Sequence, residues 1–401
     1  MNKILFITES YTTAIRLVPV YLEALKRPDV EPIMFTSSPP EGGLKTLFSR
    51  YSISTMDGGQ LLSPEDKKTL SAWQAEYSVA YAAELGKYKG DEFNYMGVPL
   101  LARYGGYFLN WNLNKLVFMY LFDKLAERHR PDLVMVAYDS GGSKKQYVTR
   151  AKELGIKTLH VQYSFYPQKK QFDRKWINSD YYCLWGEAHL KPFINEEEKR
   201  KNAFFTGNPT FDLFPVERLA GRGELGIRPE DRVFLVGIAQ MYDLERFVRE
   251  IVDYRDGHQA YFIIKLHPDY HDKVTEASAL MKDLDLKYRI IGTEIEPYKL
   301  LSVADYLVTF DQDTLWLESY YYGVKPILMT SGRDRPELAF DFLEGSTIIL
   351  RHFRELNHLS TIEKEINPLD VEEARRLLFF RADHRASPRV LDVAQGLISG
   401  N

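Results

Sequence analysis

The sequence predicts an α/β protein built from two Rossmann-like, doubly wound domains that face a shared cleft. Short apolar runs rich in Val, Ile and Phe alternate with longer helical patterns, as is typical of βαβ units and parallel sheets. This alternation occurs twice along the chain. The 401 residues, 45% of them hydrophobic, are also enough to bury two cores.

The first block of alternation predicts an N-terminal domain over residues 1–205. Its expected strands are Lys3–Thr8, Pro32–Thr36, Leu133–Ala137, Thr158–Val161 and Tyr181–Leu184. Between the second and third strands, residues 40–130 combine helical patterns with loop signals such as "SSPPEGG". We therefore expect a helical insertion within this sheet domain.

The second block predicts a C-terminal domain over residues 206–375. Its expected strands are Arg232–Ile238, Ala260–Leu266, Tyr288–Ile291, Tyr306–Phe310, Lys325–Met329 and Thr347–Leu350. Helices such as Asp243–Tyr254 and Thr314–Tyr322 fit between them. The boundary falls at "TGNPTFDLFP", residues 206–215, because glycine, asparagine and two prolines interrupt regular structure. Residues 376–401 should form a helical segment that packs back on the domains.

The composition excludes several classes of partner and compartment. A net charge of −4 with 27% charged residues lacks the basic excess that binds nucleic acid. Cys183 is the single cysteine, which excludes an intramolecular disulfide and Cys-rich zinc sites and is typical of a reducing compartment. The apolar run in the opening "MNKILFITES" is too short for a signal peptide. We expect a cytoplasmic protein.

Residues 107–122, "YFLNWNLNKLVFMYLF", come nearest to a membrane segment. Three asparagines and Lys115 interrupt the stretch, which is shorter than the roughly 20 apolar residues that a span requires. An aromatic-rich buried helix is the favoured interpretation. The alternative is an interfacial surface that contacts a lipid-linked molecule at the inner face of the cell membrane.

The strand Ala260–Leu266 continues into an unusual polar turn. Lys265, His267 and Asp269 cluster at its carboxyl end, and Pro268 stops the ladder because proline has no amide hydrogen. Ligands of doubly wound sheets bind at this edge, and an ammonium group beside an imidazole suits a phosphate. We therefore expect His267 to be catalytic as well, because its imidazole can give a proton to the leaving group. The alternative is a histidine that merely packs at a turn.

A second candidate cluster lies in "VTFDQDTLWLESYYYGVKPIL", residues 308–328. A helix should begin near Asp313 or Thr314, and its unpaired amides favour phosphate. Glu318 lies one turn further and could bind the hydroxyls of a ribose, unless it is simply a solvated glutamate. Gln240, which follows an earlier strand, joins these residues as a candidate.

These motifs carry a resemblance to a family. "KLHPD", then "LLSVADYLVTFDQDTLWLESYYYGVKPILM", then "RADHRASPRVLDV" resemble the C-terminal domain of GT-B-fold transferases of bacterial capsule and wall polymers. The group includes the CDP-glycerol glycerophosphotransferases and, more loosely, transferases with a His-Pro motif. Gly207, Pro209 and Asp212 of "TGNPTFDLF" match its domain junction. The resemblance covers roughly residues 180–395.

The resemblance implies a site for a nucleotide-activated donor. Lys265, His267 and Thr314 would hold the phosphates, and Glu318 would border the nucleoside. The donor would be CMP-, CDP- or UDP-linked, and the acceptor would be a glycan or a lipid-linked molecule. "FDQD" at 310–313 also reads as the Asp-x-Asp signature of metal-dependent glycosyltransferases. Helix capping by Asp313 is the simpler account, so we expect neither a metal nor another cofactor.

A transferase also needs a base for the acceptor hydroxyl. Glu9 follows the first strand and Asp139 follows the third, so both are expected at the cleft; capping at the helix start is the alternative for Glu9. The sequence thus predicts a glycosyltransferase or polyol-phosphate transferase. The alternatives are an isomerase resembling the non-hydrolysing UDP-GlcNAc 2-epimerases and a non-catalytic nucleotide-sugar-binding protein.

Overall fold

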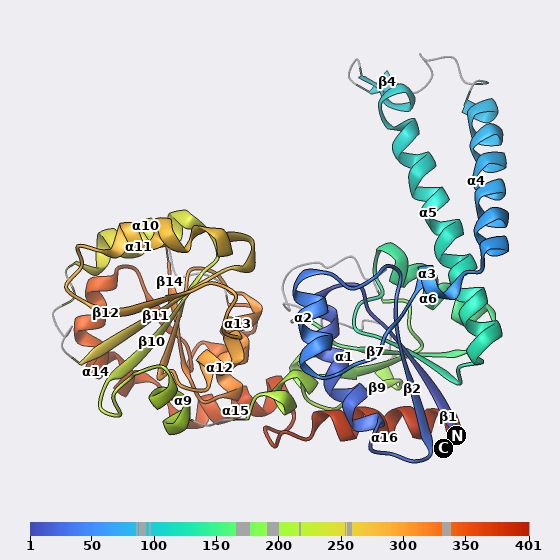
Figure 1. The fold of residues 1–401 in the computed structure, drawn as a ribbon. Helices are drawn as coiled ribbons and strands as arrows, with labels where there is room; N and C mark the ends of the chain where they lie inside the picture. Colours follow the sequence, from blue (N-terminus) through green and yellow to red (C-terminus); the bar gives the residue numbers. More distant parts are fainter. Residues whose placement is uncertain are drawn as a thin grey trace.

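The protein is described by a computed structural model. The described residues are 1–85, 87, 94–95, 98–165, 177–190, 200–215, 218–252, 254, 259–330 and 338–400. Figure 1 shows two α/β bodies, each built around a twisted sheet with helices packed on its faces.

The N-terminal body contains a seven-stranded parallel sheet with the strand order β3-β2-β1-β6-β7-β8-β9. The strands are β1 Asn2–Ile7, β2 Val30–Thr36, β3 Met56–Asp57, β6 Leu133–Val136, β7 Lys157–Val161, β8 Tyr181–Leu184 and β9 Ala203–Phe205. The helices that follow β1, β2 and β6 are α1 Tyr11–Ala24, α2 Gly42–Arg50 and α6 Gly142–Glu153. The strand order reverses between β1 and β6, which makes that place the topological switch point.

The C-terminal body contains a six-stranded parallel sheet with the strand order β12-β11-β10-β13-β14-β15. The strands are β10 Arg232–Ile238, β11 Ala260–Leu266, β12 Lys287–Ile291, β13 Tyr306–Thr309, β14 Lys325–Met329 and β15 Ile348–Leu350. The helices that cover it include α9 Arg218–Glu224, α10 Met241–Ile251, α11 Val274–Met281, α12 Pro297–Leu301, α13 Thr314–Tyr321, α14 Leu359–Ile362 and α15 Pro368–Phe379. Its switch point lies between β10 and β13.

These strands form because their residues are apolar on both faces. In β1, β6 and β10 nearly every side chain is buried, as expected where helices cover both faces of a parallel sheet. The expected strands agree with the observed ones within two residues. β3 and β9 were not predicted, because two or three residues are too few to show periodicity.

The expected insertion contains two long helices, α4 Pro64–Leu85 and α5 Leu100–His129, with the short strands β4 Asn94–Tyr95 and β5 Val98–Pro99 between them. Both helices project away from the N-terminal sheet (Figure 1). Trp73 of α4 packs edge-on against Tyr120 of α5, with ring centroids 5.3 Å apart. Trp111 is 43% exposed. The described side chains from residue 109 to residue 120 are half-buried or exposed, so the expectation of a buried helix at 107–122 was wrong for them. Val117 and Phe118 pack against the N-terminal core from one side only.

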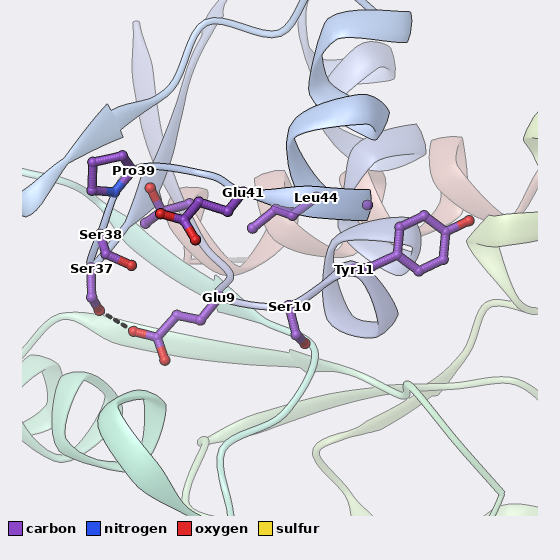
Figure 2. Close-up of a pocket in the computed structure, with 10 residues that line it drawn as sticks. Glu9, Ser10, Tyr11, Ser37, Ser38, Pro39, Glu41 and Leu44 are labelled. Atoms are coloured by element: carbon purple, nitrogen blue, oxygen red, sulfur yellow. Dashed lines mark hydrogen bonds between the residues drawn. The ribbon is translucent and has the colours of Figure 1, made fainter. Parts of the chain in front are cut away.

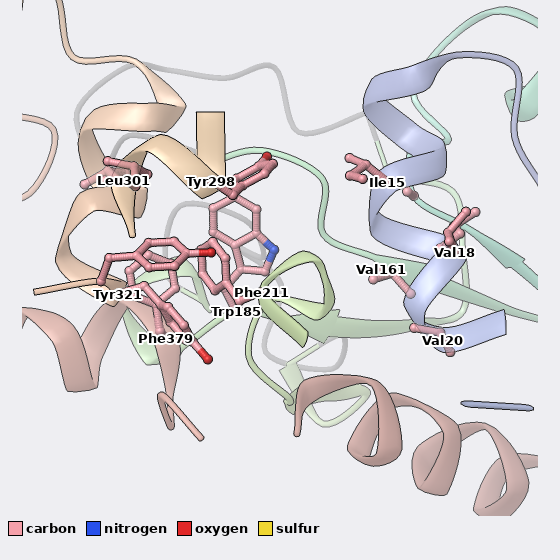
Figure 3. Packing of buried hydrophobic residues seen from close by; sticks show 14 of the residues in the cluster. Ile15, Val18, Val20, Val161, Trp185, Phe211, Tyr298, Leu301, Tyr321 and Phe379 are labelled. Carbon is pink, nitrogen blue, oxygen red and sulfur yellow. The ribbon is translucent and has the colours of Figure 1, made fainter. Parts of the chain in front are cut away.

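A single buried apolar cluster runs through both bodies (Figure 3). Trp185 follows β8, and Phe211 belongs to the linker turn Pro209–Leu213. Phe211 packs against Tyr298 of α12 and Tyr321 of α13, with centroids 6.1 and 3.9 Å away. The two bodies are thus joined by a shared core in addition to the linker.

The C-terminal helix α16, Ala386–Ser399, returns to the N-terminal body (Figure 1). Arg27, just after α1, forms an ion pair of 2.7 Å with Asp392, and Lys157 of β7 donates to the carbonyl of Leu397 at 2.5 Å. In the part of the chain that the structure describes, we found no helix long and apolar enough to cross a membrane.

Candidate functional site

The carboxyl edges of the two sheets contact each other. The hydroxyl of Ser164, after β7, lies 3.1 Å from that of Thr314 at the start of α13. The phenol of Tyr11, at the start of α1, donates to Glu296, which precedes α12. Residues after strands of both sheets therefore meet, as the site of a two-domain enzyme with doubly wound sheets requires.

His267 is the exposed group at the end of β11. Its side chain is 50% exposed, and its Nδ1 accepts a hydrogen bond of 3.3 Å from the amide of Asp269. Pro268 begins the short turn Pro268–Lys273, which ends the strand as expected. The imidazole is therefore oriented by its own turn and can reach a ligand.

Lys265, unlike His267, is not exposed to solvent. Its side chain is buried, and Nζ donates to the carbonyl of Gly292, just after β12. Burial lowers the pKa of Lys265, although Glu294 and Glu296 oppose the shift. The expected direct contact of Lys265 with a phosphate does not fit this geometry, because the ammonium ties β11 to its neighbouring strand.

Asp313 caps the helix α13. Its Oδ1 accepts a hydrogen bond of 2.7 Å from the amide of Trp316, so capping is confirmed. Burial, followed by the charges of Glu318 and Asp311, raises the pKa of Asp313 to about 7. Among the described residues, no group of three or more His, Cys, Asp or Glu side chains is arranged to hold a metal. Asp313 of the Asp-x-Asp pattern is thus the cap of α13.

Glu318 is 2% exposed, which contradicts the expectation of a carboxylate open to a ribose. It pairs with Arg16 of α1 at 2.9 Å and accepts from Asn208 at 3.3 Å. Burial raises the pKa of Glu318, and Arg16 opposes that shift. The helix face that carries Glu318 meets the other domain, so the carboxylate joins the two bodies.

Gln240 lies exposed at the start of α10, where its backbone amide donates a hydrogen bond of 3.1 Å to the carboxylate of Asp243. It follows β10, one strand from β11, and so stands on the same edge of the sheet as His267. Gln240 and the start of α13 therefore flank the C-terminal switch point, and His267 lies one strand away from it.

On the N-terminal side, Glu9 lines a pocket of about 370 Å³ (Figure 2). Its carboxylate accepts from the hydroxyls of Ser37 and Ser143, and Lys144 lies 3.8 Å away. Lys144 is 8% exposed, and burial lowers its pKa while Glu9 opposes the shift. The carboxylate of Glu9 is therefore fixed by hydrogen bonds at the carboxyl edge of the N-terminal sheet.

Asp139 is fully buried, although it was expected to face the cleft. It accepts from the amide and hydroxyl of Ser179 at 2.8 and 2.6 Å, and lies 3.2 Å from His160. Burial raises the pKa of Asp139, but His160 and Ser179 outweigh it and lower the pKa overall. A carboxylate held in this way fixes the loop after β6 and cannot reach an acceptor.

Sequence reasoning missed Arg16, the central group of the domain contact. It donates to Thr210 at 2.6 Å and to the carbonyl of Tyr163 at 3.0 Å, in addition to Glu318. The signal was a lone arginine within the apolar helix "AIRLVPV", where only a paired charge can be buried. It also missed Thr36, a buried hydroxyl in the pocket beside Glu9.

The comparisons with known proteins agree with this architecture. By sequence, the chain matches no known family and no curated protein. Among solved structures, it resembles a UDP-GlcNAc 2-epimerase from Neisseria meningitidis bound to UDP-GlcNAc, with 14% identity and a TM-score of 0.63, covering 98% of this chain and 99% of that one. The chain has the GT-B fold.

Two further structures support the same assignment. A second UDP-N-acetylglucosamine 2-epimerase has 15% identity and a TM-score of 0.62, covering 100% of this chain and 98% of that one. The wall teichoic acid polymerase TagF, with CDPG, has 9% identity and a TM-score of 0.59, covering 100% and 89%. At these identities the likeness shows the fold alone.

Proposed function

We propose that the protein is a nucleotide-sugar-dependent glycosyltransferase. It moves a sugar from a CMP-, CDP- or UDP-linked donor to a glycan or lipid-linked acceptor in the synthesis of a surface polysaccharide, in the cytoplasm. One observation carries the proposal: the carboxyl edges of the two sheets meet. The C-terminal edge presents the exposed imidazole of His267 and the start of α13, and the N-terminal edge presents the carboxylate of Glu9 in a pocket.

The donor phosphates would lie between His267 and the start of α13. The imidazole offers a directional hydrogen bond, and the helix start offers amides and the hydroxyl of Thr314. Gln240 borders the same space. Stabilising the departing phosphate oxygen lowers the barrier to breaking its bond with the anomeric carbon.

Glu9 would be the base. In the transfer, the anomeric carbon loses its bond to the phosphate oxygen and gains one to the acceptor oxygen, and the acceptor proton passes to the carboxylate. The hydroxyl donors Ser37 and Ser143 and the nearby Lys144 keep the carboxylate of Glu9 oriented before the reaction. The nucleotide leaves with the negative charge.

Lys265 and Glu318 take different roles in this proposal from those that the resemblance implies. Lys265 positions the end of β11, which carries His267, through its bond to Gly292. Glu318 holds the two domains together through Arg16. In the proposal, both residues position the parts of the site and neither contacts the nucleotide.

A nucleotide-sugar 2-epimerase is the second candidate function. The fold likeness to two UDP-GlcNAc 2-epimerases, at TM-scores of 0.62 and 0.63 over nearly the whole chain, favours it. Such an enzyme needs no acceptor. Incubation with one nucleotide sugar would then yield two epimers, whereas a transferase would leave the sugar unchanged until an acceptor is added.

A thermal-shift screen against CMP, CDP, UDP, GDP and their sugars tests the proposal. One nucleotide should stabilise the native protein, and His267→Ala should lose most of that shift. His358→Ala, which removes an exposed histidine elsewhere in the C-terminal body, should keep it. The proposal fails if no nucleotide stabilises the protein, or if His267→Ala responds like the native chain. Stabilisation by a nucleotide without turnover of any donor would instead indicate a binding protein.

A further inference from the structure

The pocket beside Glu9 has the size of a small-molecule site. Its volume of about 370 Å³ falls in the range of ligand pockets, roughly 300–1,000 Å³. It lies between the turn that follows β1 and the loop that follows β2 (Figure 2). Pro39 and Leu44 supply apolar lining, against which the C–H face of a sugar can pack.

The negative charge of the residues that line the pocket disfavours anionic ligands. Among the described residues that line the pocket, Glu9 and Glu41 carry negative charge and none is basic. Lys144 lies outside the lining, 3.8 Å from Glu9, and offsets that one carboxylate. Glu41 is exposed at the start of α2. A phosphate or carboxylate placed in the pocket would therefore be repelled.

Thr36 is one of the residues that line the pocket, and its buried hydroxyl is available for a hydrogen bond. Thr36, the last residue of β2, is 1% exposed, and its Oγ1 has no hydrogen-bond partner in the described part of the chain. Leaving such a group unpaired costs free energy, so a ligand hydroxyl that pairs with it binds more tightly. Ser38 and Ser10 add further hydroxyls to the same lining.

We propose that this pocket binds an uncharged, hydroxylated sugar residue of the acceptor and rejects acceptors that carry phosphate or carboxylate on that residue. The inference rests on the proposed function, because it takes the N-terminal body as the acceptor side. It narrows that function by disfavouring a polyol-phosphate polymer end as the acceptor. Carboxylates accept from sugar hydroxyls, and Thr36 both donates and accepts.

The test measures binding of four probes by saturation-transfer NMR and titration: methyl glucoside, methyl glucosaminide, glucuronate and glucose 6-phosphate. The neutral glycoside should bind at least tenfold more tightly than either anion. Thr36→Val keeps the shape but removes the hydroxyl, and should weaken neutral binding about five- to tenfold. Glu41→Gln should strengthen glucuronate binding severalfold with little effect on the neutral glycoside.

Two matched variants serve as controls. Thr69→Val and Glu65→Gln, both on the projecting helix α4, should leave all four affinities unchanged. The inference is overturned if an anionic sugar binds as tightly as the neutral one, if the amino sugar binds tenfold more tightly than the neutral one, or if Thr36→Val has no effect.

The same samples separate this inference from the proposed function. If a nucleotide stabilises the protein through His267 but no neutral glycoside binds, the pocket assignment fails and the proposed function stands. If the neutral glycoside binds and responds to Thr36→Val while no nucleotide binds, the pocket assignment stands and the proposed transferase fails.

Discussion

At the scale of residues, most charged candidates of the site already have a partner within the protein. Lys265 is bound by a carbonyl, Asp139 by Ser179 and His160, and Glu318 by Arg16. Buried charges persist only when they are paired in this way. His267 differs because half of its side chain is exposed, which makes it the most informative residue to replace.

Asp313 provides a prediction about pH. In an unfolded chain an aspartate titrates near pH 3.9, whereas burial raises the pKa of Asp313 to about 7. The folded state binds more protons between these values, so the stability contributed by protonated Asp313 is lost as the pH rises from about 4 to about 7. Asp313→Asn keeps a capping side chain but cannot titrate. Urea unfolding should show that it gains roughly 3–4 kcal/mol over the native chain between pH 4 and pH 8.

The control for this prediction is Asp285→Asn, which replaces an exposed carboxylate in the same body. Its stability should follow that of the native protein across the pH range. A constant difference between Asp313→Asn and the native protein from pH 4 to pH 8 would contradict the assignment of a raised pKa.

At the scale of elements, close packing of backbone fixes how the parts meet. Gly186, after β8, lies against the end of α15: an added Cβ would stand 2.3 Å from the carbonyl oxygen of Leu377 and 2.5 Å from the carbonyl carbon of Leu378. Backbone atoms cannot move aside as the end of a flexible side chain can. The glycine therefore allows the C-terminal body's last helix to contact the N-terminal sheet.

Gly186→Ala should destabilise the protein by about 3 kcal/mol or more, because the added Cβ would clash with backbone atoms of Leu377 and Leu378. Gly223→Ala is the matched control. Gly223 lies in α9, and an added Cβ there meets nothing within 4 Å, so the exchange should gain up to about 1 kcal/mol through helix propensity. Equal stability of both variants by thermal unfolding would refute the packing argument.

At the scale of the whole molecule, the domains are joined by an apolar core that encloses an ion pair. Arg16 and Glu318 are 5% and 3% exposed, 302 residues apart in sequence, and the guanidinium also lies over the ring of Trp185. Such a pair adds little net stability over apolar packing, but losing one partner leaves an uncompensated buried charge.

Arg16→Met or Glu318→Met alone should therefore cost about 3–5 kcal/mol, measured by urea unfolding. The double variant should recover much of that loss, because no charge then remains buried. Arg376→Ala, which breaks an exposed pair with Glu373, should cost less than about 1 kcal/mol. Losses in the single variants that simply add in the double variant would show that the pair does not act as a unit.

The fold could be predicted well from the sequence because its strands are uniformly apolar and separated by turn signals. The eleven expected strands are all present, including β11 with its His-Pro turn. The helix cap at Asp313 was also readable, since an aspartate before an apolar run is a local signal. The helical insertion was expected too, but the exposure of its two projecting helices was not, because an aromatic-rich pattern does not indicate whether another surface covers it.

The sequence by itself therefore determined the two parallel sheets and the placement of Glu9, Gln240, His267 and Thr314 after their strands, since these follow from local periodicity and turn chemistry. Only the tertiary structure decided which polar groups remain free. Arg16 meets Glu318, and Lys265 meets the carbonyl of Gly292, through contacts between separate strands and domains. Burial and pairing depend on which residues pack against a side chain, and the hydrophobic periodicity of the sequence does not identify those residues.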